Sequence, residues 1–395
     1  MGSIKYENQF GMYLNTQKMK CLEYNNAVIL PRKYSEKGPM WGLGGVCDNN
    51  DTFVQLSEYH GGWAEHGGFY SWDKNQEEYC DDTVVYFGVF FNHWGHFLVD
   101  LIGRMWFFAQ ERDPLKNVKL AYIGEEEPVG NFKEFFELMG LDNTRLFHIS
   151  KPTRFKKVII PEFSCRPCIW YTKEYVSIFD CIIKKVQKET GDFPIKSAPE
   201  KVYFSRQNFG KAKSSEFGEN FIEKWMKVNG YNVVSPECLT LRDQVILWNS
   251  AKQIACINGS IPINIAFSKN SELELTVLNK TSLLHKNLYL YLIMRPCKIQ
   301  FLDAYYEPFR KYPKSLGEGP FLLCINHDIK RFSKEKGMKI PFSELQIIIN
   351  NCLNFLHLIW SIINFKGKFR KIFSKTTFCN LEGTNRRKEK SLYKK

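Results

Sequence analysis

The sequence predicts an α/β protein made of two Rossmann-like lobes, each with a parallel sheet and helices on its faces. Strand-like apolar runs alternate with amphipathic helical runs from residue 84 onward, and this alternation stops at a Pro-, Gly- and polar-rich stretch before it starts again. A chain of 395 residues is also too long for one ordinary hydrophobic core, so two domains are expected.

The first lobe is expected to cover residues 1–190. Its first eighty residues are rich in Gly, Asn and aromatic side chains, which predicts short strands and loops. Strands are then predicted at 84–90, 118–124 and 155–161, and helices at 93–110, 131–140 and 172–191.

Residues 191–201, GDFPIKSAPEK, read as a linker. The second lobe, 202–342, follows with the same alternation. Strands are predicted at 201–205, 231–235, 252–257 and 272–278, and helices at 216–229, 239–251 and 261–267. The two lobes are expected to face each other across a hinge.

The last segment, 343–395, combines an apolar helix with a basic tail. Ser343 can cap a helix from Glu344 to about Phe365, in which several amides interrupt the apolar run. A helix that spans a membrane rarely carries so many amides, so an amphipathic helix on the membrane surface fits better. The alternative is a helix that packs on the second lobe and is followed by a disordered tail.

The net charge of +13 belongs mainly to that tail, because residues 366–395 contain eleven Lys/Arg and two Glu. No zinc-finger spacing, RNP motif or basic-region heptad accompanies it, so nucleic acid is not an expected partner. The start of the chain has no apolar run behind a basic segment, and a reducing cytoplasmic location is expected. The single CxxC, Cys165 to Cys168, predicts reduced thiols rather than a zinc site.

The stretch FNHWGHFLVD places ionisable side chains in an otherwise apolar helix. At 100° per residue His93, His96, Asp100 and Arg104 share one narrow stripe. Asp100 lies one turn from His96, so it can fix the histidine tautomer, as a general base requires. Arg104 is expected to hold Asp100 ionised or to bind substrate. Two alternatives remain open: a zinc site of His93, His96 and Asp100, and a buried network with a structural role only.

A second group of polar residues follows the strands of the second lobe. Arg206 comes after the strand at 201–205, and Asn258, Gly259 and Ser260 come after the strand at 252–257. Both segments are expected at the same sheet edge, where doubly wound folds bind ligands. Ser260 is expected to cap the helix that follows, whose N-terminus, with Arg206, would suit a diphosphate. No P-loop, GxGxxG or DxD motif is present, so a metal-bridged nucleotide is not expected.

These motifs, in this order, resemble glycosyltransferase family 61, particularly its bacterial capsular-polysaccharide members. The resemblance covers residues 80 to 280, from the NHWGHFLVD run to the NGSIPIN run and ELEL. It assigns His96, Asp100 and Arg104 to the first motif and Arg206 to the second. The later motifs fall on Glu219, Gln244, Gly259, Ser260, Asn264 and Glu274. Asn258 and Gly218 depart from the family pattern, which usually has His and Asn there.

The resemblance implies a GT-B fold with an interlobe cleft and an inverting, nucleotide-sugar-dependent transfer to a glycan acceptor. His96 or Asp100 would activate the acceptor hydroxyl, and no cofactor or metal is expected. The basic C-terminus would hold the enzyme at the cytoplasmic membrane face, near a lipid-linked acceptor. A zinc-dependent hydrolase and a catalytically inactive scaffold of a polysaccharide assembly are the alternatives from other classes.

Overall fold

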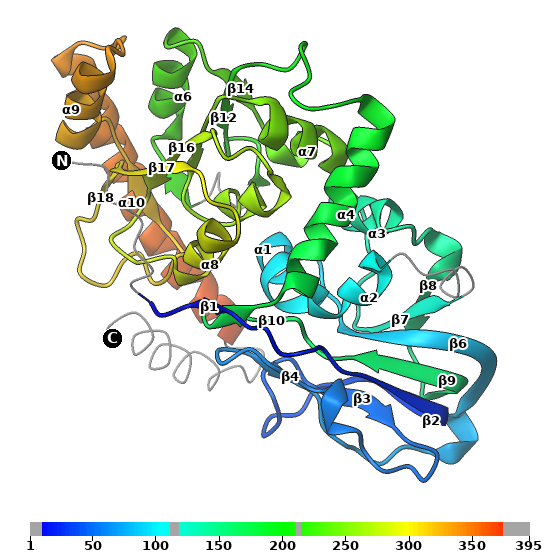
Figure 1. The fold of residues 1–395 in the computed structure, drawn as a ribbon. Helices are drawn as coiled ribbons and strands as arrows, with labels where there is room; N and C mark the ends of the chain where they lie inside the picture. The colour runs from blue at the N-terminus through cyan, green and yellow to red at the C-terminus, as the bar shows by residue number, and fades with distance from the viewer. Residues whose placement is uncertain (1–9, 111–117, 211–214, 374–395) are drawn as a thin grey trace. The chain divides into compact units, whose positions relative to one another are not determined.

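The computed structural model describes residues 10–110, 118–210 and 215–373, with side chains as far as residue 363 (Figure 1). The described chain forms two compact units. The N-terminal unit holds residues 10–192 together with Tyr289–Met294, and the C-terminal unit holds Phe193–Leu288 and the described residues from Arg295 onward. The change from one unit to the other after Asp192 falls within the segment predicted to be a linker.

The N-terminal unit is built on a six-stranded mixed sheet with the order β3-β2-β9-β6-β7-β8. Its strands are β2 (Cys21–Lys33), β3 (Leu43–Cys47), β6 (Glu78–Val89), β7 (Lys119–Ile123), β8 (Leu146–Ile149) and β9 (Thr153–Pro161). The three predicted strands, β6, β7 and β9, are parallel to one another or to their neighbours as expected, and the unpredicted β8 pairs parallel with β7. Strand β2 pairs antiparallel with both β3 and β9. The small strands are β1 (Tyr13–Leu14), β4 (Tyr59–His60), β5 (Glu65–His66), β10 (Cys165–Arg166) and β11 (Trp170–Tyr171).

The helices α3 (Asn131–Leu138) and α4 (Lys173–Thr190) of this unit lie where the sequence predicted them. Thr172 caps α4 by accepting a hydrogen bond from the Tyr175 backbone N–H, and Gly191 ends it at a φ of 96°. The prediction of only short strands before residue 80 was wrong, because β2 is 13 residues long. Asn26, at a φ of 53°, interrupts the pairing of β2 with β9, so the strand lacks the regular alternation that would have marked it.

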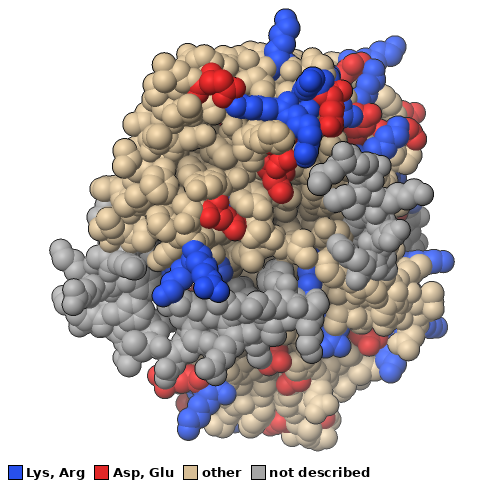
Figure 2. Space-filling view, turned by 90° about the vertical axis from the view of Figure 1, so that its left-hand side faces the viewer, with Lys and Arg blue, Asp and Glu red and all other residues tan. Residues whose placement is uncertain are grey.

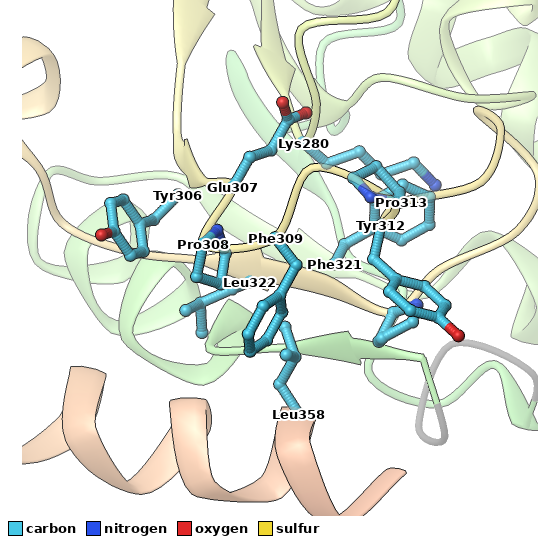
Figure 3. A pocket seen from close by; sticks show the side chains of 11 residues that line it. Lys280, Tyr306, Glu307, Pro308, Phe309, Tyr312, Pro313, Phe321, Leu322 and Leu358 are labelled. Carbon is cyan, nitrogen blue, oxygen red and sulfur yellow. The ribbon is translucent and has the colours of Figure 1, made fainter. Parts of the chain in front are cut away.

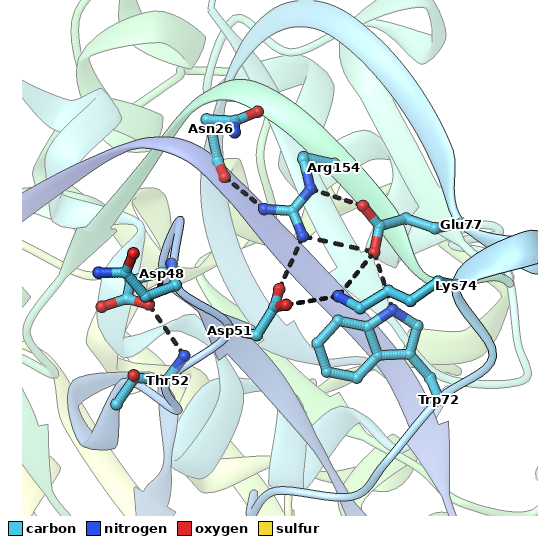
Figure 4. A network of polar contacts seen from close by, with 9 residues as sticks. Asn26, Asp48, Asp51, Thr52, Trp72, Lys74, Glu77 and Arg154 are labelled. Carbon is cyan, nitrogen blue, oxygen red and sulfur yellow. Dashed lines mark hydrogen bonds and ion pairs between the residues drawn. The ribbon is translucent and has the colours of Figure 1, made fainter.

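A polar network fixes β9 to its neighbours at one end of this sheet (Figure 4). The Arg154 guanidinium donates to Glu77 at 2.5 Å, to Asp51 at 2.7 Å and to the carbonyl of Asn26 at 2.6 Å. Lys74 donates to Asp51 at 2.6 Å, so two cations and two carboxylates alternate. Each charge has an opposite partner, and the network therefore has a structural role.

The segment predicted as one helix, 93–110, is helical but irregular. It consists of α1 (Trp94–His96), the π-helical turn η3 (Phe97–Leu101), the 3-10 turn η4 (Ile102–Arg104) and α2 (Trp106–Ala109). A π turn has wider hydrogen bonding than an α-helix and often marks a functional site. It also changes the rotation per residue, so a face assigned at 100° per residue does not continue past Asp100.

The C-terminal unit is built on a parallel five-stranded sheet with the order β14-β12-β15-β16-β17 (Figure 1). The strands are β12 (Lys201–Phe204), β14 (Asn232–Val234), β15 (Gln253–Ile257), β16 (Glu274–Asn279) and β17 (Lys298–Asp303). The helical elements are α6 (Glu219–Val228), η7 (Pro236–Cys238), α7 (Leu241–Ser250), η8 (Pro262–Phe267) and α9 (His327–Lys336). Helix α8 (Lys286–Met294) begins in this unit, but its residues from Tyr289 onward belong to the N-terminal unit. The alternation predicted for 201–278 is confirmed, except that Glu216 and Phe217 form a short strand before α6 rather than its first turn.

A second, three-stranded sheet carries the C-terminal helix. Its order is β13-β19-β18, made of β13 (Glu216–Phe217), β19 (Phe321–Leu323) and β18 (Tyr305–Tyr306). Helix α10 (Glu344–Phe373) contacts β13 and β19. The predicted cap is confirmed, since Ser343 Oγ accepts from the Gln346 backbone N–H and Gln346 Oε1 accepts from the Ser343 N–H.

Candidate functional site

His96 and Asp100 form the pair that the sequence predicted in the N-terminal unit. His96 Nδ1 lies 2.8 Å from Asp100 Oδ2. The His96 side chain is 28% exposed, whereas that of Asp100 is fully buried. In the tautomer whose Nδ1–H donates a hydrogen bond to the carboxylate, Nε2 is an acceptor. Nε2 has no hydrogen-bond partner among the described residues. The imidazole is thus oriented by a buried carboxylate and keeps one nitrogen available.

Two aromatic side chains that sequence reasoning missed complete the surroundings of Asp100. The Tyr59 hydroxyl and the Trp63 Nε1–H both donate to Asp100 Oδ1, the latter at 2.9 Å. Burial and the neighbouring carboxylate raise the pKa of Tyr59 well above its ordinary value, so it remains a donor. Together with His96, these two donors hold the Asp100 carboxylate in a fixed position. The segment YHGGW, in the region predicted to form short strands and loops, therefore contributes directly to the site.

Aromatic rings also surround the imidazole of His96. The ring centroids of Trp63, Trp41 and Phe91 lie 5.0, 5.5 and 5.8 Å from that of His96. His93 has a different role, because its Nδ1 accepts from the His96 backbone N–H and so caps α1. The exposed part of His96 is therefore bordered by flat apolar surfaces.

Arg104 lies elsewhere than predicted. Its guanidinium donates to four backbone carbonyls, those of Pro161, Phe87, Leu56 and Glu58. It makes no hydrogen bond or ion pair with Asp100. The side chain is 1% exposed, and burial lowers its pKa to about 10. The expectation that Arg104 holds Asp100 ionised or binds substrate was wrong, because the π turn directs it into the core. By holding residues 56–58, Arg104 instead fixes the backbone that leads to Tyr59.

The zinc alternative required His93, His96 and Asp100 to converge. Within the residues that the structure describes, no group of three or more His, Cys, Asp or Glu side chains is arranged to hold a metal ion. His93 is engaged as a helix cap, and Asp100 is surrounded by hydrogen-bond donors. The hydrogen bonds that Asp100 accepts from Tyr59, Trp63 and His96 suit a histidine oriented by a carboxylate better than a zinc site.

The second group of residues lies at the carboxyl edge of the parallel sheet in the C-terminal unit. Arg206 follows β12, Asn258 and Gly259 follow β15, and Lys280 follows β16. Arg206 Nε donates to Glu216 Oε2 at 2.8 Å, and Lys280 Nζ donates to Glu216 Oε1 at 2.7 Å. The two cations are thus held on one carboxylate.

Lys280 and Glu216 were missed by sequence reasoning. Lys280 is 3% exposed and Glu216 is 7% exposed. Burial lowers the pKa of Lys280. Burial also opposes the ionisation of Glu216, but the charges of Lys280 and Arg206 outweigh it and hold the pKa of Glu216 below its usual value. A signal for Lys280 was present, because it directly follows the strand LTVLN and so had to emerge at the same edge as Arg206.

Arg206 retains hydrogen-bonding capacity at this edge. Within the described chain its Nη1 and Nη2 atoms have no partner, and its side chain is 14% exposed. A Cβ placed on Gly259 would lie 3.8 Å from Lys280 Nζ, so the glycine backbone lies beside the lysine. The edge therefore combines an available guanidinium, an ammonium group and a close backbone approach, which are the groups that bind phosphates.

Glu219 supports Arg206 from behind. Its Oε1 accepts from the Arg206 backbone N–H at 2.9 Å and from the Tyr203 hydroxyl at 2.8 Å. Burial raises the pKa of Glu219 to about 7, and the charge of Glu216 acts in the same direction. Glu219 thus fixes the backbone of Arg206 and changes charge near neutral pH.

Asn258 takes part in a chain of amides across three strand ends. Asn258 Nδ2 donates to Asn279 Oδ1 at 3.0 Å, and Asn279 Nδ2 donates to Asp303 Oδ1 at 2.8 Å. Asn258 Oδ1 lies 2.9 Å from Nδ1 of His285. Burial lowers the pKa of His285 to about 4, and nearby Lys280 acts in the same direction, so this imidazole is neutral. The His285 imidazole therefore lies beside the turn after β15. The position in that turn where the resembled family usually has a histidine is Asn258 in this chain.

Three other predicted site residues have different surroundings from those expected. Ser260 does not cap a helix, because η8 is a six-residue 3-10 helix whose N-cap is Ile261, and no side chain bonds to that cap. Gln244 donates to the carbonyl of Pro236 at 3.0 Å and accepts from Asn264 at 3.4 Å, both being buried. These two amides join η7, α7 and η8 beneath the edge.

Glu274 lies far from the other predicted donor-site residues. It is the first residue of β16, where its carboxylate accepts from Gln253 at 2.9 Å, whereas Asn279 ends the strand at the edge that carries Arg206. Five residues of extended strand correspond to roughly 16 Å. The prediction that Glu274 belongs to this group was wrong, because the short spacing placed the motif at the amino end of the strand.

Lys280 also lines a pocket (Figure 3). It is lined mainly by aromatic residues and prolines of 306–322, and Leu358 of α10 closes it from below. Its empty volume of about 210 Å³ is smaller than the roughly 300 Å³ usual for small-molecule sites. The pocket as it stands does not hold a nucleotide.

Among proteins with curated descriptions, none matches the chain. A solved structure that matches is that of the dodecameric iron-containing heptosyltransferase TibC in complex with ADP-D-beta-D-heptose. It is 10% identical, with 75% of this chain and 80% of that chain covered and a TM-score of 0.26.

The family comparison covers both groups of residues. Residues 94–273 match the model of Glycosyltransferase 61. This range includes His96 and Asp100 in the N-terminal unit, and Arg206, Glu219 and Gly259 in the C-terminal unit. By this match, residues 94–273 belong to glycosyltransferase family 61.

Proposed function

We propose that the protein transfers a sugar from a nucleotide-diphosphate-sugar to a hydroxyl group of a glycan acceptor, with inversion at the anomeric carbon. The observation that supports this most is the pair of cations at the carboxyl edge of the five-stranded parallel sheet in the C-terminal unit. Arg206 and Lys280 share Glu216, Lys280 lies beside Gly259, and the Arg206 Nη atoms are left available.

In this proposal the donor diphosphate binds at that edge. Arg206 and Lys280 carry two positive charges, of which Glu216 neutralises one. The remaining charge and the Arg206 N–H groups would stabilise the negative charge that develops on the leaving nucleoside diphosphate, a contribution of about 3 kcal/mol for each well-placed donor. No metal ion is required for this step, so the proposed reaction is metal-independent.

The acceptor would be activated by His96. Nε2 of His96 takes the proton of the acceptor hydroxyl while the oxygen forms a bond to the anomeric carbon. The bond from that carbon to the phosphate oxygen breaks, and its electron pair leaves with the nucleoside diphosphate. Asp100 holds Nδ1–H and stabilises the imidazolium that forms. Attack from the face opposite the leaving group inverts the configuration.

This reaction needs the two units arranged as the lobes of a GT-B enzyme, with the edge that carries Arg206 facing His96, and that arrangement is part of the proposal. The family resemblance further suggests capsular or surface polysaccharide synthesis on the cytoplasmic side. A lipid-linked glycan is the acceptor class that fits such a role.

A donor screen tests the proposal. The purified chain is incubated with UDP-, GDP- and CMP-sugars and a panel of glycan acceptors, and nucleotide release is measured with and without EDTA. We expect turnover with one class of diphosphate donor and no loss with EDTA. Zinc-dependent hydrolysis that EDTA abolishes, or the absence of nucleotide affinity, would support the hydrolase or scaffold alternative instead.

A further inference from the structure

The polarity of α10 is reversed relative to an ordinary surface helix. Asn350, Asn351 and Asn354 each have a buried amide atom without a hydrogen-bond partner in the part of the chain that the structure describes. Asn354 lies against the second sheet, since its Nδ2 would be 3.2 Å from a Cβ placed on Gly218. A surface helix of a soluble protein normally places its polar side chains outward and its apolar side chains inward.

The outward side of α10 is apolar. Seven large side chains on it are each at least half exposed: Leu345 65%, Ile348 57%, Ile349 50%, Leu353 53%, Leu356 59%, Trp360 68% and Ile363 63%. They recur at intervals of three or four residues, so they form one stripe. Only Glu344 is charged between residues 344 and 363. We call these seven residues the outer stripe. A continuous exposed apolar face of this kind marks an interaction surface.

The opposite side of α10 is fixed to the protein. Ile347 and Leu358 are 4% and 2% exposed, and Ile347 belongs to the hydrophobic core of the C-terminal unit. Glu344–Ile363 is long and apolar enough to cross a membrane by length and composition alone. To do so, however, it would have to leave β13 and β19 and bring its three asparagines into the hydrocarbon, which is costly. The packing therefore favours a helix that lies along a surface.

The sequence after the outer stripe carries the opposite charge to an anionic lipid. Residues 366–395 contain eleven Lys/Arg and two Glu. Figure 2 shows one face of the molecule, on which charged side chains lie in separate groups with wide uncharged areas between them. We infer that the outer stripe of α10 docks on the surface of an anionic lipid bilayer and that the basic segment after it strengthens the attachment.

Lipid explains the combination better than a second copy of the chain does. A second copy of the chain would offer the same apolar stripe but also the same positive charge in residues 366–395, and so no opposite charge to pair with it. Anionic headgroups, in contrast, attract such a segment, and an apolar helix face inserts at the boundary between headgroups and acyl chains. Trp360, the most exposed of the seven residues, belongs to the residue type that prefers that boundary. This inference does not depend on the transfer chemistry.

Sedimentation with vesicles tests the inference on the full chain. We expect the protein to sediment with vesicles of phosphatidylcholine that contain about one third phosphatidylglycerol, and much less with phosphatidylcholine alone. Salt should weaken the binding, because it screens the basic segment. No sedimentation with anionic vesicles would overturn the inference.

Substitutions on the outer stripe identify the surface. The triple variant Leu353→Ser, Leu356→Ser, Trp360→Ser should bind anionic vesicles at least about tenfold more weakly, because three exposed apolar groups lose their burial in lipid. Val228→Ser is the matched control, since Val228 is 51% exposed on another helix of the same unit, and it should bind as the parent chain does. Equal binding by all three proteins would show that another surface attaches the chain.

Two further measurements separate the other possible occupants. Alkaline carbonate should release the protein from vesicles, whereas resistance to extraction would indicate a spanning helix. Light scattering of the vesicle-free protein should give the same mass for the parent chain and the triple variant. A dimer that the triple variant dissociates would assign the outer stripe to a second copy. Trp360→Phe should lose the fluorescence blue shift that vesicles cause, which places this side chain in the lipid.

Discussion

His96 Nδ1 lies 2.8 Å from Oδ2 of Asp100, a carboxylate that also accepts hydrogen bonds from Tyr59 and Trp63. The carboxylate is buried, while the imidazole reaches the surface. This arrangement orients one nitrogen of His96 and leaves the other for a substrate. The predictions that follow test this pair, the buried Arg104 and the cationic edge of the five-stranded sheet.

Replacement of His96 by alanine should lower kcat by about 10²- to 10⁴-fold, because no other group takes the acceptor proton. Affinity for the nucleoside diphosphate should be unchanged, since His96 does not contact the phosphate site in this account. Steady-state kinetics and calorimetry on the same preparation check both parts. Full turnover by His96→Ala would remove the proposed base.

The Asp100→Asn variant should also lose most of its activity while it keeps its shape. An amide can present an N–H to Nδ1, which would stabilise the wrong histidine tautomer and leave no negative charge beside the imidazolium. The pH dependence of kcat should therefore change as well as its maximum. Tyr59→Phe is the comparison, because it removes one donor to Asp100 but keeps the charge. If Asp100→Asn were as active as Tyr59→Phe, the carboxylate would have only a structural role.

Arg104→Met should destabilise the fold rather than change substrate affinity. The variant removes the donor to four carbonyl oxygens that are held by one buried side chain, at an expected cost of about 3 kcal/mol or more in the free energy of unfolding. Urea unfolding of the parent and variant measures this. Arg331→Met is the control, because the Arg331 side chain is 41% exposed and its loss should change stability by less than about 0.5 kcal/mol.

Glu219 should make stability depend on pH. Its pKa is about 7 in the folded protein against an ordinary value of 4.5, so the folded state binds the proton more tightly than the unfolded state does. Its contribution is greatest below pH 4.5, falls as pH rises towards 7, and is then constant. The full change is about 3 kcal/mol.

Glu219→Gln replaces the titrating carboxyl group with an amide that does not titrate, and so isolates the contribution of Glu219 to the pH dependence of stability. The variant should gain stability relative to the parent chain as pH rises from about 5 to 7, with a constant difference at higher pH. Thermal unfolding of both proteins across this range provides the measurement. Parallel stability curves would show that Glu219 does not titrate near neutral pH.

The sequence predicted most of the sheet framework, because period and turn chemistry are local. The strands β6, β7, β9, β12, β14, β15 and β16, and the helices α3, α4, α6 and α7, lie at or close to the predicted segments. Strand β2 was missed, since its partners β3 and β9 are defined by long-range pairing and its alternation is broken at Asn26. Elements after residue 285 were also mostly unassigned, apart from α10.

Contacts in the candidate site were predictable only where both partners lie on the same helical segment. His96 and Asp100 are one turn apart on the same segment, so spacing alone indicated their hydrogen bond. Tyr59 and Trp63 reach Asp100 from a segment 37 or more residues away in the sequence, and no local pattern indicates such a contact. Arg104 was misplaced because a helical wheel assumes a regular turn, and the π turn at Phe97–Leu101 is not regular.

Titration of paired nucleotides tests the central claim most directly. UDP and UMP, or the pair of the base that the donor screen identifies, are titrated into the parent chain, Arg206→Ala and His96→Ala. The account predicts that the parent chain and His96→Ala bind the diphosphate more tightly than the monophosphate, by about tenfold or more, and that Arg206→Ala loses this preference. Equal affinity of the parent chain for the two nucleotides, or an unchanged preference in Arg206→Ala, would contradict a diphosphate site at the edge that carries Arg206 and Lys280.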